Sequence, residues 1–192
     1  MKLRRGWFLV FCSVTLIAVG YACQDQSISP TDSRQNVAVV PQQVKGQPPL
    51  AVGNLLTNFR THLNGRNVVS PVDTRAQGEA IFHLGNDGSQ ISYKLTAANI
   101  ENLLMAHIHL GTPEENGPVV VWLYPKDGPP PHLIDGRFNG VLAEHTIPAD
   151  DLGGPLEGMP LDSLITHIGN GNAYVQAHTE QNPAGEIRGQ IR

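Results

Sequence analysis

The sequence has few cysteines and few charged residues. Its 192 residues include two cysteines, Cys12 and Cys23, and only 16% are Asp, Glu, Lys or Arg. Two cysteines, one of them inside an apolar N-terminal run, exclude a disulfide framework, so the fold must depend on its own core. The formal net charge is −4 and no basic stretch alternates with aromatic residues. This argues against nucleic acid as a partner.

Familiar catalytic motifs are also missing. The sequence has no Gly-x-Ser-x-Gly, no phosphate-binding loop and no dinucleotide fingerprint, and no cysteine follows Cys23. Nucleophilic and nucleotide-dependent chemistry normally depends on such motifs. Their absence favours a binding protein over an enzyme.

No apolar run has the length of a membrane-spanning helix, which needs about 20 residues. The uncharged run from Trp7 to Val19 follows Lys2, Arg4 and Arg5, which is typical of a signal peptide. Gly20-Tyr21-Ala22-Cys23 then resembles a bacterial lipoprotein processing site. We therefore expect a signal peptide over 1–22 and lipidation at Cys23. Simple cleavage after Ala22, leaving a free thiol, is the alternative.

The composition changes twice along the chain. Residues 23–53 are rich in Gln, Ser, Pro and Val without sustained periodicity, which predicts a lipidated N-terminus followed by a flexible tether. Residues 54–192 have short apolar stretches separated by turn residues, the pattern of an antiparallel β-sandwich or barrel. We therefore expect an exported protein, periplasmic or on the cell surface, anchored to a membrane by lipid.

Within 54–192 we expect eight strands and one short helix. The helix is Leu161 to Ile168, where four apolar residues have helical spacing and Gly169 follows. Asn86-Asp87-Gly88 is a strong hairpin turn between the second and third strands. The predicted strands are 55–63, 78–84, 90–97, 105–110, 118–124, 136–147, 173–179 and 186–192.

Three histidines in two of these strands suggest a metal site. His107 and His109 share one face of their strand, about 6–7 Å apart, and His178 comes from the strand 173–179. Three imidazoles can hold copper or zinc. The other interpretation is that these histidines bond to backbone or carboxylate groups and pin the loop 111–117 against the last hairpin.

Glu186 and Arg188 are predicted to share one face of the last strand. Glu186 is close in sequence to His178, which makes it a candidate for a fourth ligand or for an acceptor behind the ligands. A ligand-facing Glu–Arg pair is one interpretation of these two residues. A structural salt bridge on the solvent face of the strand is the interpretation that we favour.

Six spaced motifs in this region resemble the CHRD domain, a family of domains named after chordin. They are Leu63 to Gly65, Gly78 to Phe82, Ala106 to Gly111, Asn116 to Val120, Ala173 to Thr179 and Asn182 to Gln190. The resemblance implies a Greek-key or immunoglobulin-like β-fold.

The resemblance bears on the fold, and the residues leave two expectations for function. The first is a membrane-tethered module of the cell envelope that binds an envelope or extracellular ligand without catalysis. The alternative is a copper- or zinc-binding metalloprotein that uses the three histidines, with an analogy in fold to the copper/zinc superoxide dismutases.

Overall fold

The computed structural model describes residues 57–192. The signal peptide 1–22, the lipidation site Cys23 and the tether predicted up to residue 53 lie outside these residues. The elements are β1 (Asn58–Asn64), η1 (Gly65–Asn67), β2 (Gln77–Leu84), β3 (Gln90–Leu110), β4 (Val119–Tyr124), β5 (Ile134–Pro148), η2 (Ala149–Asp151), η3 (Gly154–Leu156), α1 (Leu161–Gly169), β6 (Ala173–Thr179) and β7 (Ile187–Gln190).

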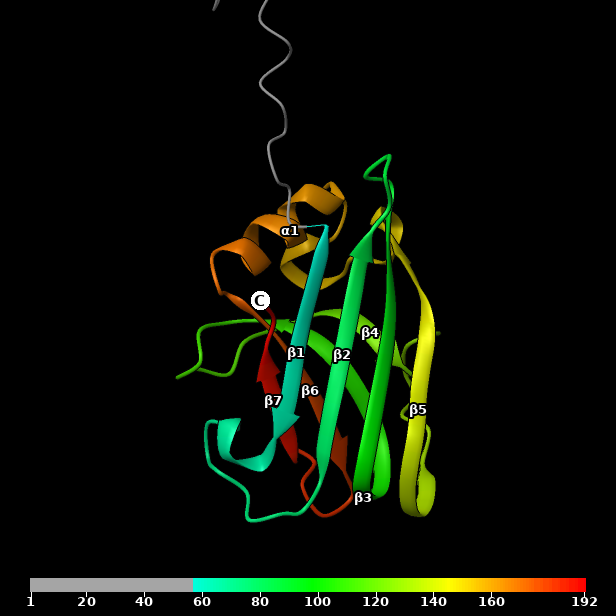
Figure 1. The fold of residues 1–192 in the computed structure, drawn as a ribbon, viewed down its shortest axis with the longest axis vertical. Helices are drawn as coiled ribbons and strands as arrows, with labels where there is room; N and C mark the ends of the chain where they lie inside the picture. Colours follow the sequence, from blue (N-terminus) through cyan, green and yellow to red (C-terminus); the bar gives the residue numbers. More distant parts are fainter. Residues whose placement is uncertain (1–56) are drawn as a thin grey trace, which may run out of the picture. The chain divides into compact units, whose positions relative to one another are not determined.

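The strands form one antiparallel sheet that closes into a barrel through β3 (Figure 1). The sheet runs β2-β1-β7-β6-β3, and the N-terminal half of β3 pairs again with β2. Most of β5 pairs with β3, and β4 pairs with the C-terminal half of β3. The predicted all-β antiparallel fold with one short α-helix is confirmed.

The long strand β3 differs from the prediction of two separate strands. Residues 90–97 and 105–110 belong to one strand of 21 residues. The sequence between them, Ala98 to Leu104, contains Asn99 and Asn102, which interrupt the alternation of apolar and polar residues. The hairpin turn at Asn86 to Gly88 is confirmed, with Gly88 at a φ of 71°.

The barrel encloses a core of alternating strand residues. Phe59, Leu63, Ile91, Leu95 and Ile108 are among its fully buried members. Helix α1 adds a short apolar stripe to the same core, because Leu161, Leu164, Ile165 and Ile168 are all buried. Within residues 57–192, no helix combines the length and apolar character needed to cross a membrane.

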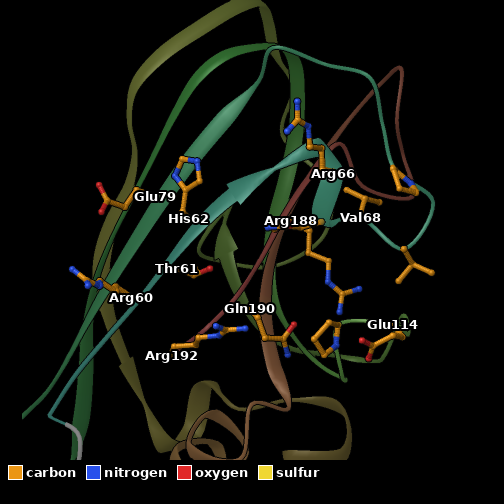
Figure 2. A pocket seen from close by; sticks show the side chains of 14 residues that line it. Arg60, Thr61, His62, Arg66, Val68, Glu79, Glu114, Arg188, Gln190 and Arg192 are labelled. Atoms are coloured by element: carbon orange, nitrogen blue, oxygen red, sulfur yellow. Dashed lines mark hydrogen bonds between the residues drawn. The ribbon is translucent and has the colours of Figure 1, made fainter.

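A hollow with a volume of about 1010 Å³ lies over β1 and β7 (Figure 2). Its walls come from η1 and the residues after it on one side and from the loop between β3 and β4 on the other. It is lined by Arg60, Thr61, His62, Arg66, Asn67, Val68, Val69, Pro71, Glu79, Pro113, Glu114, Arg188, Gln190 and Arg192.

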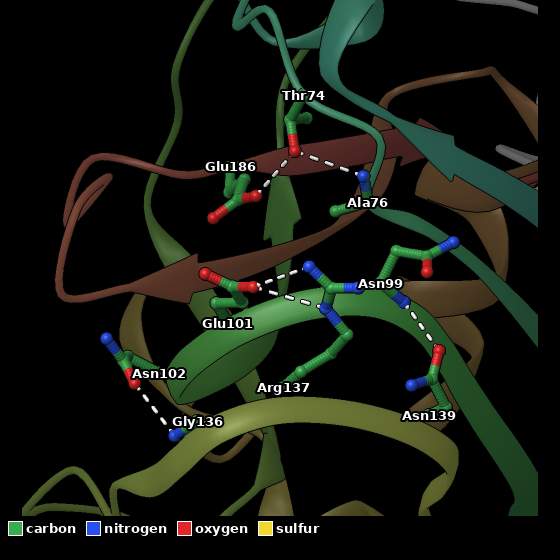
Figure 3. A network of polar contacts seen from close by, with 9 residues as sticks. All are labelled: Thr74, Ala76, Asn99, Glu101, Asn102, Gly136, Arg137, Asn139 and Glu186. Atoms are coloured by element: carbon green, nitrogen blue, oxygen red, sulfur yellow. Dashed lines mark hydrogen bonds and ion pairs between the residues drawn. The ribbon is translucent and has the colours of Figure 1, made fainter.

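Two asparagines let β3 change register in its middle. Asn99 and Asn102 have φ angles of 55° and 51°, in the left-handed region that asparagine tolerates better than most residues. The backbone N–H of Asn99 donates to Asn139 Oδ1, and Asn102 Oδ1 accepts from the N–H of Gly136 (Figure 3). These bonds hold β5 against the irregular part of β3.

Replacing Asn99 tests the role of this irregularity. The side chain of Asn99 is exposed and does not pack in the core. A substitution therefore changes mainly how well the residue tolerates a positive φ angle. We expect Asn99→Val to lower the free energy of unfolding by about 1–3 kcal/mol, because a β-branched residue is strained at positive φ. Asn99→Gly should stay within about 0.5 kcal/mol of wild type. Urea unfolding measures both, and an Asn99→Val variant as stable as wild type would contradict the assignment.

Candidate metal centre

His107, His109 and His178 lie on the outer face of two neighbouring strands. In β3, Ala106 and Ile108 point into the core, so His107 and His109 point the other way. The register pairs His107 with Gln176 and His109 with Tyr174 of β6. His178 is two residues beyond Gln176 and therefore shares this face.

The structure brings the three imidazoles together. Each offers a ring nitrogen, and these nitrogens all lie within 4.8 Å of one another. His107 Nδ1 and His178 Nε2 are 3.3 Å apart. The side chains are 2%, 8% and 6% exposed for His107, His109 and His178. The cluster is therefore shielded from solvent.

Backbone carbonyls determine which nitrogens are free. His109 Nδ1 lies 2.9 Å from the carbonyl oxygen of Gly117, and His178 Nδ1 lies 3.0 Å from that of Pro183. Because a carbonyl only accepts, both Nδ1 atoms must carry the proton, and both Nε2 atoms present a lone pair. Among the described residues, Nε2 of His107 and Nε2 of His109 are buried without a hydrogen-bond partner.

Burial keeps these imidazoles neutral. Burial, together with the nearby His178 and His109, lowers the pKa of His107 to about 3. Burial also lowers the pKa of His178 to about 4, against the opposing effect of its bond to Pro183. The pKa of His109 is lowered by burial as well. Neutral imidazoles are the form that binds a metal ion.

The separation of the nitrogens suits a shared ion. Two ligands at about 2.0–2.1 Å from a tetrahedral centre are about 3.3 Å apart. The distance between His107 Nδ1 and His178 Nε2 therefore fits a hydrogen bond in the metal-free protein. It equally fits two ligand atoms of one metal ion in the metal-bound protein. Both interpretations from the sequence, metal ligation and pinning of loops, are compatible with this geometry.

Aromatic rings and one buried cation surround the cluster. Tyr174 stacks on His109 with ring centroids 5.0 Å apart, and Trp122 meets His107 edge to face at 4.2 Å. The guanidinium carbon of Arg188 lies 3.4 Å from the centroid of the Tyr174 ring. Arg188 also donates to the carbonyls of Thr112 and Glu115. It thereby fixes the loop that carries Gly117.

Gly117 allows this loop to approach β3. A Cβ at this position would lie 1.5 Å from the carbonyl oxygen of Leu110. The Gly117 N–H donates to the hydroxyl of Tyr174, while its carbonyl accepts from His109. A single residue without a side chain therefore bonds to both members of the ring stack.

The expected salt bridge between Glu186 and Arg188 on the solvent face is wrong. Both side chains are buried, at 7% and 1% exposed, and they contact different groups. Glu186 accepts from the hydroxyls of Thr74 and Thr179, and the Thr74 contact is drawn in Figure 3. The two residues diverge because the loops that cover this face supply partners for each of them.

Glu186 acts on the loop that holds His178. Its second oxygen also accepts from the side-chain amide of Asn182, next to Pro183, and none of its hydrogen bonds goes to a cluster histidine. Glu186 therefore orders the residues around the Pro183 carbonyl. Its predicted place behind the ligands stays a prediction.

Several residues of the site were missed from the sequence. The carbonyls of Gly117 and Pro183 have no signature of their own, because loop closure brings them to the cluster. Tyr174 shares a strand face with His178 in the sequence pattern, but only the register between β6 and β3 places it against His109. Met105 could have been found, since it alternates with His107 and His109. It pairs with His178 in the register and so shares its face.

The low pKa values predict that the metal-free protein loses stability in acid. In the unfolded chain each histidine takes up a proton below about pH 6.5, whereas the folded protein resists protonation of His107 and His178 until about pH 3–4. The free energy of unfolding is therefore not reduced by these histidines above about pH 6.5. Below that pH, each of the two histidines lowers the free energy of unfolding by about 1.4 kcal/mol per pH unit, or by about 4 kcal/mol for both at pH 5.

Denaturant unfolding at pH 7.5, 6.0 and 5.0 measures this loss. Variants His107→Gln and His178→Gln should show a shallower pH dependence than wild type, whereas His62→Gln, at an exposed histidine, should keep the full slope. Equal slopes in all four proteins would contradict the assignment.

One family comparison matches most of the described residues. The CHRD domain matches residues 59–191, from the second residue of β1 to the residue after β7. No curated protein and no solved structure matched the chain in the corresponding comparisons. The matched range contains the whole barrel and all three cluster histidines. The chain therefore belongs to the CHRD domain family.

Proposed function

We propose that this protein is a metal-binding module that holds one copper or zinc ion on His107, His109 and His178. The observation that carries the proposal is that three buried imidazoles each place one ring nitrogen within 4.8 Å of the other two, with His107 Nδ1 and His178 Nε2 at 3.3 Å. The third nitrogen, Nε2 of His109, has a lone pair that is buried without a partner within residues 57–192. Leaving such an atom unpaired costs about 1–3 kcal/mol. An ion that accepts this lone pair removes the cost.

The charges around the cluster favour copper in its monovalent state. No carboxylate contacts the three imidazoles among the bonds of the described residues, because Glu186 is committed to Thr74, Thr179 and Asn182. The positive charge of Arg188 lies close enough to lower the pKa of His109. A divalent ion in this buried setting would carry more uncompensated charge than a monovalent one. The thioether of Met105, on the same face, is a soft donor suited to Cu(I).

Burial of the cluster supports holding an ion rather than turnover. Catalytic metal sites keep one coordination position open to substrate. Here the three ligands are almost fully buried and two loops are bonded to them. A superoxide dismutase-like reaction needs small molecules to reach the ion, so we favour a non-enzymatic binding role.

Elemental analysis of protein purified without a histidine tag tests the proposal. We expect about one copper or zinc ion per chain, and less than a tenth of that in the triple variant His107→Gln, His109→Gln, His178→Gln. The matched control replaces His62, His83 and His145, which are exposed, and should keep the ion. Circular dichroism verifies folding of both proteins.

A thermal shift separates specific binding from contamination. Adding Cu(I) or Zn²⁺ to stripped wild type should raise the unfolding temperature, because an ion that binds only the folded state stabilises it by about 2.7 kcal/mol at 100 times its Kd. The triple variant should not respond. Metal retained by the triple variant at wild-type levels would refute the site.

We also propose that the domain is exported and tethered to a membrane through Cys23. The support is in the sequence: a basic start, the apolar run to Val19, and one cysteine followed by a Pro-rich segment. The tether would place the barrel within the cell envelope, where it can meet an envelope or extracellular ligand.

Replacing Cys23 tests the anchor. Cys23→Ser should leave the unfolding temperature unchanged and should release the protein from the membrane fraction. Acyl chains contribute about 0.8 kcal/mol per buried CH₂ and stable attachment needs more than one signal. The segment after Cys23 has no basic patch to replace them. If wild type and variant fractionate identically in the soluble pool, Cys23 is not an anchor.

A further inference from the structure

We propose that the hollow over β1 and β7 binds an acidic saccharide, with its carboxylate or sulfate group between Arg60 and Arg192. This site goes beyond the metal-binding function and does not use the three histidines. Figure 2 shows Arg60 on β1, Gln190 on β7 and Arg192 just after β7, with the two arginine side chains extending to opposite sides. Arg66 lies at one end of the hollow and Glu114 at another side.

Two residues of like charge, Arg60 and Arg192, lie side by side on the backbone at this hollow. Arg60 and Arg192 exchange both backbone hydrogen bonds, N–H to O at 2.8 and 3.0 Å. Residues that pair in this way project their side chains to the same face, where like charges repel. Within residues 57–192, neither guanidinium forms an ion pair. A local conflict of this kind is typical of a functional site.

The hollow has the opposite charge to the chain as a whole. Its lining residues include three exposed arginines, Arg60, Arg66 and Arg192, and two carboxylates, those of Glu79 and Glu114. The guanidinium of Arg188 also borders the hollow, but it is buried and bonded to loop carbonyls. The complete chain has a formal net charge of −4. Guanidinium groups bind carboxylate, sulfate and phosphate through paired N–H donors. An anion is therefore the ligand that this surface favours.

One side-chain oxygen on the face of the hollow, Oε1 of Gln190, is buried without a partner among the described residues. The amide nitrogen of Gln190 donates to the carbonyls of Gly111 and Gly171, which fixes the oxygen as the free end. An oxygen of this kind needs a hydroxyl or N–H donor. A sugar supplies hydroxyls beside its acidic group, whereas a bare inorganic anion does not.

The size of the hollow agrees with a ligand larger than a single ion. A volume of about 1010 Å³ is at the upper end of the range for small-molecule sites, about 300–1,000 Å³. Val68, Val69, Pro71 and Pro113 add apolar surface on which sugar rings can pack. One or two acidic sugar rings fit these dimensions.

Calorimetric titration of the purified protein tests the proposal with four probes. Digalacturonate supplies carboxylates on a sugar, sucrose octasulfate supplies sulfates on a sugar, pyrophosphate supplies an anion without hydroxyls, and maltose supplies hydroxyls without charge. We expect binding of at least one acidic sugar, at least tenfold weaker binding of pyrophosphate, and none of maltose. Binding should weaken as the salt concentration rises.

Matched variants locate the site. Arg60→Gln and Arg192→Gln should each weaken acidic-sugar binding at least tenfold and should not lower the unfolding temperature of the free protein, since each relieves the repulsion. Arg137→Gln, whose guanidinium bonds to Glu101, should bind as wild type does, and so should His107→Gln. The proposal is overturned if no acidic sugar binds, if pyrophosphate binds as tightly, or if Arg137→Gln loses as much affinity as Arg60→Gln.

Discussion

A buried guanidinium group organises the surroundings of the histidine cluster. Arg188 lies over the ring of Tyr174, and Tyr174 stacks on His109, so that three planar groups from β7, β6 and β3 pack in one column. The same cation bonds to two carbonyls of the loop between β3 and β4. Because a buried cation must satisfy its N–H groups, these strands and this loop cannot be rearranged independently. The position of the cluster depends on that column.

The second constraint is the length of β3. Its N-terminal half pairs with β2 and β5, and its C-terminal half pairs with β6 and β4. A single strand can serve four neighbours only if it bends and changes register midway, and Asn99 and Asn102 provide that change. The barrel closes through this strand, and His107 and His109 are in its C-terminal half. The barrel and the cluster thus share one element.

The sequence was informative where a residue's role follows from local periodicity. Alternation along 105–110 and 173–179 predicted which histidines face together, and the helix at 161–168 followed from its spacing. The continuity of β3 could not be predicted, because Asn99 and Asn102 resemble a loop unless their hydrogen bonds to β5 residues are known. The burial of Glu186 and Arg188 was missed for a related reason. Strand alternation assigned both to one face, but only the tertiary fold shows that loops cover that face.

The bonds from imidazoles to the carbonyls of Gly117 and Pro183 also have a kinetic consequence. An ion held by this cluster would be covered by the same two loops that orient its ligands. Its exchange with solution would therefore wait for a local opening, and the rate of exchange would depend on loop residues that never touch the ion. Such a centre can keep its ion for long periods even at modest affinity. Residence time and equilibrium affinity would then be set by different parts of the sequence.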